Sequence, residues 1–411
     1  MPVPDDSPFP IENLPLGVGR ADHTSRAWVA IGDHALDLAA THRTGLLEGL
    51  DLPTGCFAGD ALNPYLATGP DAWRATRARL TDLLTDAAHQ PVLGPMLRPR
   101  TDLVMGVPID VGDYVDFYSS LHHATNLGRL FRPDSEPLLP NWRHLPVGYH
   151  GRSGTIIPTD TAIPRPQGLR LIDDELHFGP TDALDIELEV GTVIGVGSRR
   201  GTPVPTSDAG RHLYGMCLVN DWSARDVQAY EYQPLGPFLG KSFATSVSPW
   251  LVGFDALAPY RVEPPAQVPP PSPYLGTEDP WGFDLHLDVQ IQSAAMRDQG
   301  VPPLTVSSTS FADMYWTPAP QLAHLTVNGA STRSGDLFAS GTVSGPSPGS
   351  EGSLIELTHR GERPLDLPDG TRRAFLLDGD RVTLRGWAGG AGRPRIGLGE
   401  VSGTITASTK G

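Results

Sequence analysis

Residues 113 to 154 form the stretch of the sequence that is richest in side chains able to do chemistry. Asp116 offers a hard anionic ligand, and Tyr118 offers a phenol that can donate a hydrogen bond. His123 carries an imidazole that changes protonation near neutral pH, and Arg132 carries a guanidinium suited to carboxylates. A polar surface helix with a decorated loop would account for any one of these residues. Together they indicate a site only if distant parts of the chain supply partners.

Carboxylates also gather on a strand predicted at residues 184 to 197. Its alternation puts Asp185, Glu187 and Glu189 on one face and apolar side chains on the other. Carboxylates two positions apart repel one another, and Asp and Glu are poor strand formers. This face is therefore either a solvated acidic surface or a site that binds a cation.

A further predicted strand, residues 212 to 221, is apolar through its middle and ends in Asn220 and Asp221. Polar residues at the end of a buried strand commonly lie at the mouth of a site. The next segment is predicted to be helical from residue 223 to 232, and its spacing puts three polar side chains on one face: Arg225, Gln228 and Tyr232. The loop that follows holds two possible site donors, Lys241 and Thr245.

Four carboxylates from separate segments could meet around one cation: Asp116, Glu187, Glu189 and Asp221. If they converge, they cannot all be ionised without a counter-charge, because like charges a few ångströms apart raise one another's pKa. A divalent ion resolves the conflict, and an all-oxygen ligand set suits Ca²⁺ or Mg²⁺. The absence of paired cysteines and of an HxxxH pattern argues against structural zinc.

The elements that must hold these residues are predicted to be mostly short strands. The chain has 411 residues, of which 46 are Gly and 42 are Pro, so it is dense in turns. A chain of this length exceeds the usual size of one core, and two folding units are expected. Clustered prolines place the boundary near residues 95 to 110. We therefore divide the chain into an N-terminal unit, residues 1–105, and a larger unit that carries the site, residues 106–411.

Several elements can be predicted individually. Residues 27–38 predict a hairpin around Gly32 and Asp33, and the Ala-, Leu- and Arg-rich segment that Pro70 opens predicts a helix. Proline-rich residues 262–282 predict an extended loop.

The C-terminal part is predicted to be an antiparallel β-rich unit. Residues 283–292 alternate as expected of a strand with one wet face. Three further segments are assigned to the same unit: GDLFASGTVSG, SLIELTHRG and RRAFLLDGDRVTLRGWA.

Charge and cysteine content limit the class of protein. The formal net charge is −16 and no basic run occurs, so nucleic acid and anionic membranes are poor partners. The sequence start shows no targeting segment, and no stretch approaches the ~18 apolar residues of a membrane span. Cys56 and Cys217 are the only cysteines, which fits a reducing interior. We expect an untargeted, cytoplasmic protein.

Long motifs between about residues 113 and 400 resemble those of the fumarylacetoacetase family: DFYSSLHHATN, PNWRHLPVGYHGR, ELE, NDWSARDVQ, EYQPLGPFLGKSFATSVSPW, ASGTVSGP and LLDGD. The resemblance implies a mostly β fold with a minor α part. This fold comprises a small N-terminal SH3-like β-barrel and a large mixed β-sandwich or β-roll domain. The resemblance also implies a homodimer. The implied activity is hydrolysis of the carbon–carbon bond of 4-fumarylacetoacetate to fumarate and acetoacetate, the last step of tyrosine and phenylalanine breakdown.

The resemblance also assigns roles to individual residues. It implies Ca²⁺ bound by Asp116, Glu187, Glu189 and Asp221, and a second, structural Mg²⁺ near Asp221, Lys241 and Thr245. It implies that His123 is the base and that Glu356 orients it. The implied substrate contacts come from six residues: Tyr118, Arg132, Tyr149, Gln228, Tyr232 and Thr342. The family pattern is altered by His122, directly before His123, and by the loop SPGSEGS before Glu356.

The implied chemistry suits these residue types. Attack of water on a 1,3-diketone requires a base, stabilisation of an oxyanion and departure of a carbon group as an enolate. A histidine oriented by a carboxylate can take the proton. Arg225, Gln228 and Lys241 can stabilise the oxyanion, and a Lewis-acidic cation makes the enolate a tolerable leaving group. Lys241 could equally be a structural ion-pair partner of the acidic cluster.

Two other functions fit part of the sequence. Acylpyruvate hydrolases, decarboxylases and isomerases of the same superfamily use a related metal site, but the chain length and the HHATN and GYHG stretches disfavour them. A calcium-stabilised β protein without activity would explain Glu187 and Glu189. It would not explain a His, Arg and Tyr set in one stretch with Asp116.

Overall fold

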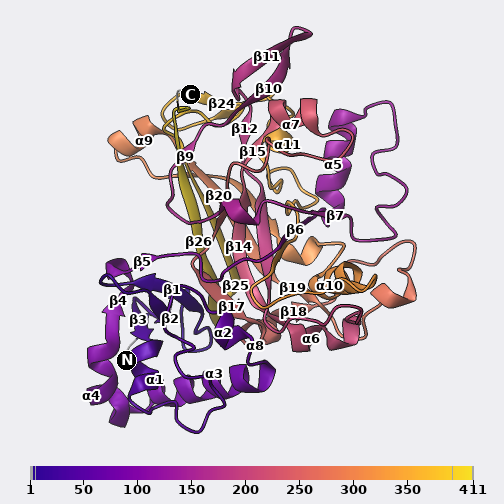
Figure 1. Cartoon of the computed structure of the whole chain (residues 1–411). Coiled ribbons are helices and arrows are strands. Elements are labelled where there is room, and N and C mark those ends of the chain that lie inside the picture. Colours follow the sequence, from indigo (N-terminus) through magenta and orange to yellow (C-terminus); the bar gives the residue numbers. More distant parts are fainter. Residues whose placement is uncertain (1–2, 5, 391, 410–411) are drawn as a thin grey trace.

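The computed structural model describes residues 3–4, 6–390 and 392–409, and two β-sheets form most of its body (Figure 1). In the described residues the larger sheet has 13 strands, and its main order is β4 (Leu97–Pro99), β3 (His34–Asp37), β2 (Arg26–Ile31), β1 (Leu16–Arg20), β17 (Trp250–Gly253), β14 (Leu213–Asp221), β13 (Leu188–Ile194), β22 (Leu337–Ala339), β6 (Tyr114–Phe117) and β7 (Gly148–His150). Three more strands pair beside this path: β5 (Val104–Met105), β8 (Ile156–Pro158) and β16 (Thr245–Val247).

The smaller sheet has five strands in the described residues, in the order β21 (Leu304–Ser310), β20 (Leu285–Gln292), β25 (Arg381–Gly390), β26 (Arg393–Thr406) and β9 (Ile163–Pro164). Short two-stranded pairs complete the β structure: β10 (Gln167–Ile172) with β11 (Glu175–Pro180), β12 (Leu184–Asp185) with β15 (Ser223–Ala224), β18 (Arg261–Val262) with β19 (Gly282–Phe283), and β23 (Leu365–Asp366) with β24 (Arg372–Arg373).

Most of the helices are short, and strands outnumber them in the described residues. They are α1 (Leu38–Arg43), α2 (Asn63–Leu66), α3 (Pro70–Thr85), α4 (Gln90–Leu93), α5 (Leu121–Phe131), α6 (Ala209–His212), α7 (Arg225–Glu231), α8 (Phe254–Leu257), α9 (Ala294–Asp298), α10 (Pro318–Thr326) and α11 (Leu354–Leu357). The mostly β class predicted from the sequence is therefore confirmed.

The N-terminal strands continue the large sheet and do not close on themselves. The predicted hairpin is confirmed as β2 and β3, and the predicted helix is confirmed as α3. However, β1 pairs with β2 on one side and with β17 on the other, so Leu16 lies opposite Leu251 of the C-terminal part. Because β1 is joined to β17 in this way, the described residues form no closed SH3-like barrel, and that expectation is not confirmed.

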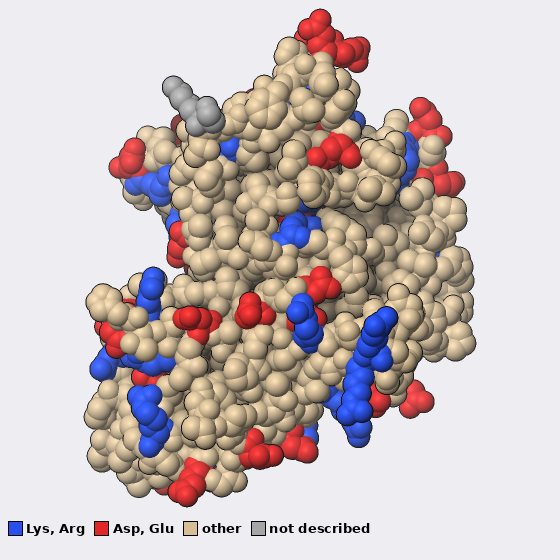
Figure 2. Space-filling model, viewed as in Figure 1, with Lys and Arg blue, Asp and Glu red and all other residues tan. Residues whose placement is uncertain are grey.

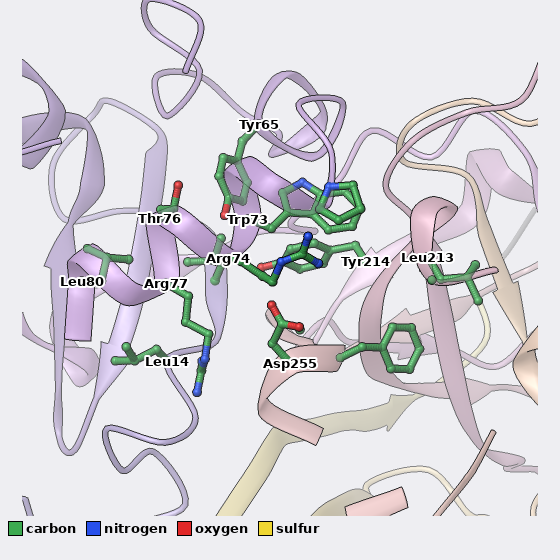
Figure 3. Close-up of a pocket in the computed structure, with 15 residues that line it drawn as sticks. Leu14, Tyr65, Trp73, Arg74, Thr76, Arg77, Leu80, Leu213, Tyr214 and Asp255 are labelled. Atoms are coloured by element: carbon green, nitrogen blue, oxygen red, sulfur yellow. The ribbon is translucent and has the colours of Figure 1, made fainter. Parts of the chain in front are cut away.

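Helix α3 packs the N-terminal part onto the remainder of the chain. Trp73 of α3 meets Tyr214 of β14 edge-on, with ring centroids 5.2 Å apart. A cavity of about 60 Å³ lies beside this contact, and Figure 3 shows Arg74, Arg77 and Asp255 around it. Its lining includes none of the predicted site residues. We therefore assign this cavity to the packing of α3.

Strand pairing brings acidic residues from separate segments to one region of the large sheet. β13 pairs antiparallel with β14, with Glu189 opposite Val219, and Asp221 N donates to Glu187 O (3.1 Å). β22 pairs with β13 on one side and in parallel with β6 on the other, where Ala339 lies opposite Asp116. Asp185, Glu187 and Glu189 are all buried, which excludes a solvated acidic face.

The C-terminal prediction needs two corrections. The expected one-sided strand is confirmed in β20, where Leu285, Leu287 and their alternating successors are buried. The unit is not purely antiparallel, because β22 pairs in parallel with β6 and β26 in parallel with β9. SLIELTHRG is not a strand either, since it forms the single-turn helix α11. The proline-rich loop is confirmed as irregular chain between β18 and β19, apart from one turn at Pro273–Leu275.

Candidate active site

A buried histidine–carboxylate pair lies in the first turn of α5. His123 Nδ1 is 2.6 Å from Glu356 Oε2, and both side chains are almost fully buried. Glu356 also accepts hydrogen bonds from Asn126 Nδ2 (2.9 Å) and Ser353 Oγ (2.6 Å). Burial raises the pKa of Glu356, but His123 and these hydrogen bonds outweigh burial and hold the pKa below its ordinary value. The ionised carboxylate therefore accepts the Nδ1–H hydrogen bond, which leaves Nε2 as the ring nitrogen that can exchange a proton with another group.

Local structure fixes both members of this pair. Ser120 is the N-cap of α5, and its Oγ accepts a hydrogen bond from His123 N (3.2 Å). Asp185 accepts hydrogen bonds from the backbone N–H groups of Leu354 (2.7 Å) and Ile355 (3.0 Å). These N–H groups lie at the start of α11 and would otherwise be unpaired, so Asp185 explains why this segment becomes helical. It also anchors the helix that carries Glu356.

Three buried carboxylates from different strands form an acidic triad: Asp116 of β6, Glu189 of β13 and Asp221 of β14. Each offers one oxygen, and these oxygens all lie within 4.8 Å of one another. Both carboxylate oxygens of Glu189 and Oδ1 of Asp116 are buried and have no hydrogen-bond partner among the described residues. Buried polar atoms normally have partners. A set of unpartnered carboxylate oxygens at this spacing fits a hard divalent ion.

Two buried cations contact the acidic triad directly. Arg152 Nη2 lies 2.6 Å from Asp116 Oδ2 and 2.8 Å from Asp221 Oδ2. Lys241 Nζ lies 2.6 Å from Asp221 Oδ2 and also bonds to Glu187 Oε2. Burial lowers the pKa of Lys241, but Asp221 and Glu187 together raise it above its ordinary value, so Lys241 stays charged.

Arg225 connects these charges to the helix that holds Glu356. Its Nη1 lies 2.7 Å from Glu187 Oε1, and its Nε lies 2.8 Å from Asp185 Oδ2. Across the described residues, this buried network contains five carboxylates, namely the acidic triad with Asp185 and Glu187, and three cations, namely Arg152, Arg225 and Lys241. If all are ionised, two negative charges lack compensation, and one divalent ion would supply them.

The pKa values show where the compensation is missing. Burial and the neighbouring carboxylates raise the pKa of Glu189 well above its ordinary value. Burial also raises the pKa of Asp116, to about 6, although Arg152 opposes the shift. At Glu187 burial is outweighed by Lys241 and Arg225, which lower the pKa. Glu189 and Asp116 are therefore the carboxylates whose negative charge is not compensated by a neighbouring cation, and they are the ones that a metal ion would stabilise.

The predicted ion ligands divide into two groups. Asp116, Glu189 and Asp221 meet in the acidic triad, whereas the oxygens of Glu187 are bonded to Arg225 and Lys241. The three residues predicted for a second ion are also brought together: Lys241 and Thr245 both contact Asp221, with Thr245 Oγ1 3.4 Å from Asp221 Oδ1.

Three of the predicted substrate residues contact the charged network or the histidine. The ring of Tyr118 lies edge-on to His123, with centroids 5.3 Å apart. Tyr149 donates its hydroxyl hydrogen to Asp116 Oδ2 (3.1 Å). Gln228 Oε1 accepts a hydrogen bond from Arg225 Nη1 (3.2 Å), as expected for two residues one turn apart on α7.

The other three have different surroundings. Thr342 is buried, and its hydroxyl oxygen has no hydrogen-bond partner. Arg132 follows α5, and its Nη2 donates to Pro137 O (2.8 Å) while its Nε is buried without a partner. Tyr232 follows α7 and is 40% exposed, and its hydroxyl accepts a hydrogen bond from Gln233.

Three residues of this site are missing from the predicted set. Arg152 could have been found from its place in the GYHGR motif, a cation that follows a glycine turn. Asp185 is part of the predicted acidic strand, but its spacing cannot show that it binds the start of α11. Asn126, which donates to Glu356, lies in the HATN motif and gives no separate chemical signal.

The surface and helices add little to the choice of partner. On the face shown in Figure 2, basic and acidic side chains are interspersed, and no continuous basic track crosses it. Within the described residues, no helix combines the length and apolar character needed to cross a bilayer.

Comparisons with known proteins identify the family. Residues 12–108 match the family model "Fumarylacetoacetase N-terminal", and residues 114–406 match "Fumarylacetoacetate (FAA) hydrolase C-terminal". The chain is 44% identical to fumarylacetoacetase from Arabidopsis thaliana, over 99% of this chain and 97% of that protein, and 44% identical to the Homo sapiens enzyme, over 98% of each. A fumarylacetoacetate hydrolase from Exiguobacterium antarcticum shares the fold, with a TM-score of 0.53 at 16% identity, covering 96% of this chain and 99% of that chain. The chain therefore belongs to the fumarylacetoacetase family of hydrolases.

Proposed function

We propose that this hydrolase cleaves the carbon–carbon bond of 4-fumarylacetoacetate to give fumarate and acetoacetate, and that it requires a divalent metal ion. One observation carries the proposal: buried ion pairs of Arg225 and Lys241 link Asp185, which binds the helix of Glu356, to the acidic triad, and Glu356 in turn holds His123. Cleavage of a 1,3-diketone by water requires both a base and a charge that stabilises an enolate. The identity with fumarylacetoacetases supports the substrate.

His123 is proposed as the general base. Its Nε2 accepts a proton from water, and the water oxygen bonds to the carbonyl carbon of the fumaryl part. Glu356 keeps Nδ1 protonated and stabilises the imidazolium that forms. The carbon–carbon bond then breaks, its electron pair leaves with acetoacetate as an enolate, and the proton on Nε2 returns to the leaving carbon.

Arg225, Gln228 and Lys241 are proposed to stabilise the oxyanion formed when water attacks. Arg225 and Lys241 are buried, and both are held by Glu187, so their positive charges are in position before the substrate binds. Such preorganised charges need no reorganisation when the negative charge develops. Lys241 therefore has the structural and the catalytic role together, because the same ion pairs that hold it also keep it protonated.

The proposed metal ligands are the acidic triad with Glu187 beside it, and Ca²⁺ is the proposed ion. A second ion, Mg²⁺, is proposed near Asp221, Lys241 and Thr245. The unpartnered oxygens of Glu189 and Asp116 and the two uncompensated charges fit a divalent cation. When bound, such an ion supplies a Lewis-acidic charge that stabilises the negative oxygen of the enolate leaving group.

Substrate positioning is proposed to come from Tyr118, Tyr149, Tyr232, Thr342 and Arg132, with Gln228 shared between binding and catalysis. Arg132 is the residue type that binds a carboxylate through two parallel hydrogen bonds. We assign it to a terminal carboxylate of the substrate. Tyr118 is proposed to position the substrate next to the base, because its ring packs edge-on against His123.

The test is an ultraviolet assay of diketone loss in the presence of excess Ca²⁺ or a chelator. We expect cleavage of 4-fumarylacetoacetate that stops with chelator and returns when Ca²⁺ is added back. An acylpyruvate serves as the comparison substrate, since related enzymes of the superfamily would favour it. Turnover that is unaffected by thorough chelation would refute the metal requirement, and a preference for the acylpyruvate would refute the substrate.

The biological setting is part of the proposal. We propose a cytoplasmic homodimer that carries out the last step of tyrosine and phenylalanine breakdown, as the resemblance of its motifs to the family implies. The division into units 1–105 and 106–411 also stays a proposal, because β1 and β17 join both in one sheet. Light scattering coupled to size-exclusion chromatography would measure the oligomeric state.

A further inference from the structure

Arg152 is a buried cation of the site that takes no part in the proposed reaction steps. Its side chain is 4% exposed, and Nη2 bonds to the Oδ2 atoms of both Asp116 and Asp221, at 2.6 and 2.8 Å. The guanidinium also lies over the rings of Tyr114 (5.0 Å) and Tyr149 (5.2 Å). Aromatic faces and carboxylates therefore hold one guanidinium between two strands, β6 and β14.

The backbone of Arg152 adopts a strained conformation, and this conformation accompanies the position of its guanidinium between the two carboxylates. Arg152 has a φ of +56°, the left-handed conformation that residues other than glycine rarely adopt. It directly follows Gly151, which also has a positive φ. Such outliers persist only where the surrounding contacts determine them, and they cluster at functional sites. Here the determining contacts are the two ion pairs to the acidic triad.

The contacts of Arg152 leave a definite set of oxygens free. Arg152 engages Oδ2 of Asp116 and Oδ2 of Asp221. Among the described residues, Asp116 Oδ1 and both oxygens of Glu189 have no hydrogen-bond partner, and Asp221 Oδ1 has a long contact to Thr245 Oγ1, at 3.4 Å. The oxygens bound by the guanidinium are therefore not the oxygens that are free to bind an ion. Without a cation between them, Asp116 and Asp221 would repel one another and turn apart.

We propose that Arg152 is a positioning residue of the metal centre, which binds Asp116 and Asp221 through Oδ2 so that their other oxygens and Glu189 converge on one divalent ion. The inference rests on the metal dependence proposed above. Residues that orient metal ligands from outside the coordination sphere typically change metal affinity by about 10- to 100-fold when they are replaced. Because Arg152 acts on the ligands, its loss should lower affinity for the ion and disturb coordination before it alters any chemical step.

The experiment measures metal binding by the whole chain, with no substrate present. Ca²⁺ affinity is determined by competition with a chromophoric chelator. Tb³⁺, a luminescent probe that binds hard oxygen sites, reports the number of coordinated waters through its lifetimes in H₂O and D₂O. For Arg152→Gln we expect affinity lower by about 10- to 100-fold and additional Tb³⁺-bound water where a carboxylate has turned away. Arg152→Lys keeps the positive charge but lacks the planar guanidinium with its several N–H donors, and it should recover part of the affinity.

The matched control is Arg373→Gln. Arg373 is also buried and bonds to one carboxylate, Asp380, at 2.7 and 2.9 Å, and Asp380 is outside the acidic triad. This variant should lose stability and keep the wild-type affinity and water count. This inference would be overturned if the Ca²⁺ affinity of Arg152→Gln were within twofold of wild type, or if Arg373→Gln lost as much Ca²⁺ affinity. Either result would leave the proposed metal dependence standing. A wild-type chain that binds neither Ca²⁺ nor Tb³⁺ would overturn the proposed metal dependence, and this inference with it.

Discussion

His123 owes its basic nitrogen to Glu356, because the carboxylate engages Nδ1 and leaves Nε2 to accept a proton. His123→Ala removes a proton acceptor and no metal ligand. We expect kcat to fall by about 10²- to 10⁴-fold, while Ca²⁺ affinity stays close to that of wild type. The protein should still fold, with a lower unfolding temperature, because buried Glu356 loses its partner. The control is His122→Ala, because His122 is the neighbouring histidine and is less buried. Near-normal kcat in His123→Ala, or a larger loss in His122→Ala, would move the role of base elsewhere.

Glu356 gives a prediction about acid stability. Its pKa is lowered from 4.5 in the folded protein, so its ionised form stabilises the fold above about pH 4.5, and this contribution is lost as the pH falls through the folded value. Glu356→Gln should therefore be less stable than wild type at pH 7, and the difference should shrink below pH 4.5. Urea denaturation of both proteins across this range measures it. A difference that does not change with pH would contradict an ionised Glu356. The variant should also lose less kcat than His123→Ala.

Arg132 provides the test of substrate recognition. If it binds a terminal carboxylate, wild type should prefer a diketo acid over its methyl ester by about 10- to 100-fold in kcat/KM, because a charged hydrogen bond contributes roughly 1.5–3 kcal/mol. Arg132→Ala should raise KM for the acid and barely change the ester. Steady-state kinetics on both substrates give the answer. Equal kcat/KM for acid and ester in wild type would exclude carboxylate recognition.

At the scale of elements, the start of α11 is bound by one distant residue, Asp185. Asp185 binds the backbone at the start of α11 and pairs with Arg225, so Asp185→Asn should weaken both the fold and the position of Glu356. Breaking a buried ion pair costs about 3–5 kcal/mol, and kcat should also fall. Asp380→Asn is the control, since Asp380 pairs with buried Arg373 and caps Leu377 N. It should lose stability and keep kcat. Equal kcat in the two variants would show that Asp185 does not support catalysis.

The contrast between α11 and β20 shows what sequence patterns can predict. β20 alternates over eight residues, and its period alone predicts a strand with one buried face. α11 is one turn long, and its helical state comes from Asp185, which is 169 residues earlier than Leu354. The same limit applies to the site. The sequence pattern placed Glu189 on the strand that is β13, but the pairing of Arg152 with Asp116 and Asp221 depends on tertiary packing that no spacing reveals.

At the scale of the whole molecule, the large sheet is what brings the acidic triad together. Asp116, Glu189 and Asp221 come from β6, β13 and β14, and the order β14-β13-β22-β6 sets them near one another. The same sheet continues through β17 into β1, so the N-terminal strands share their hydrogen bonds with the site-bearing strands. Burial of this many charges in one sheet costs free energy unless every charge is compensated. Metal binding should therefore stabilise the whole fold.

Glu189 allows that stabilisation to be measured. Both its oxygens are buried without a partner, so in the presence of chelator its charge opposes folding, and with metal bound it contributes to stability. A ligand at about 100 times its Kd adds about 2.7 kcal/mol, which corresponds to roughly 3 °C for a chain of this size. Wild type should therefore unfold about 3 °C higher with Ca²⁺ than with chelator. Glu189→Gln should show no such shift and should unfold above chelated wild type, because the uncompensated charge is gone. An equal Ca²⁺ shift in both proteins would place the ion somewhere other than the acidic triad.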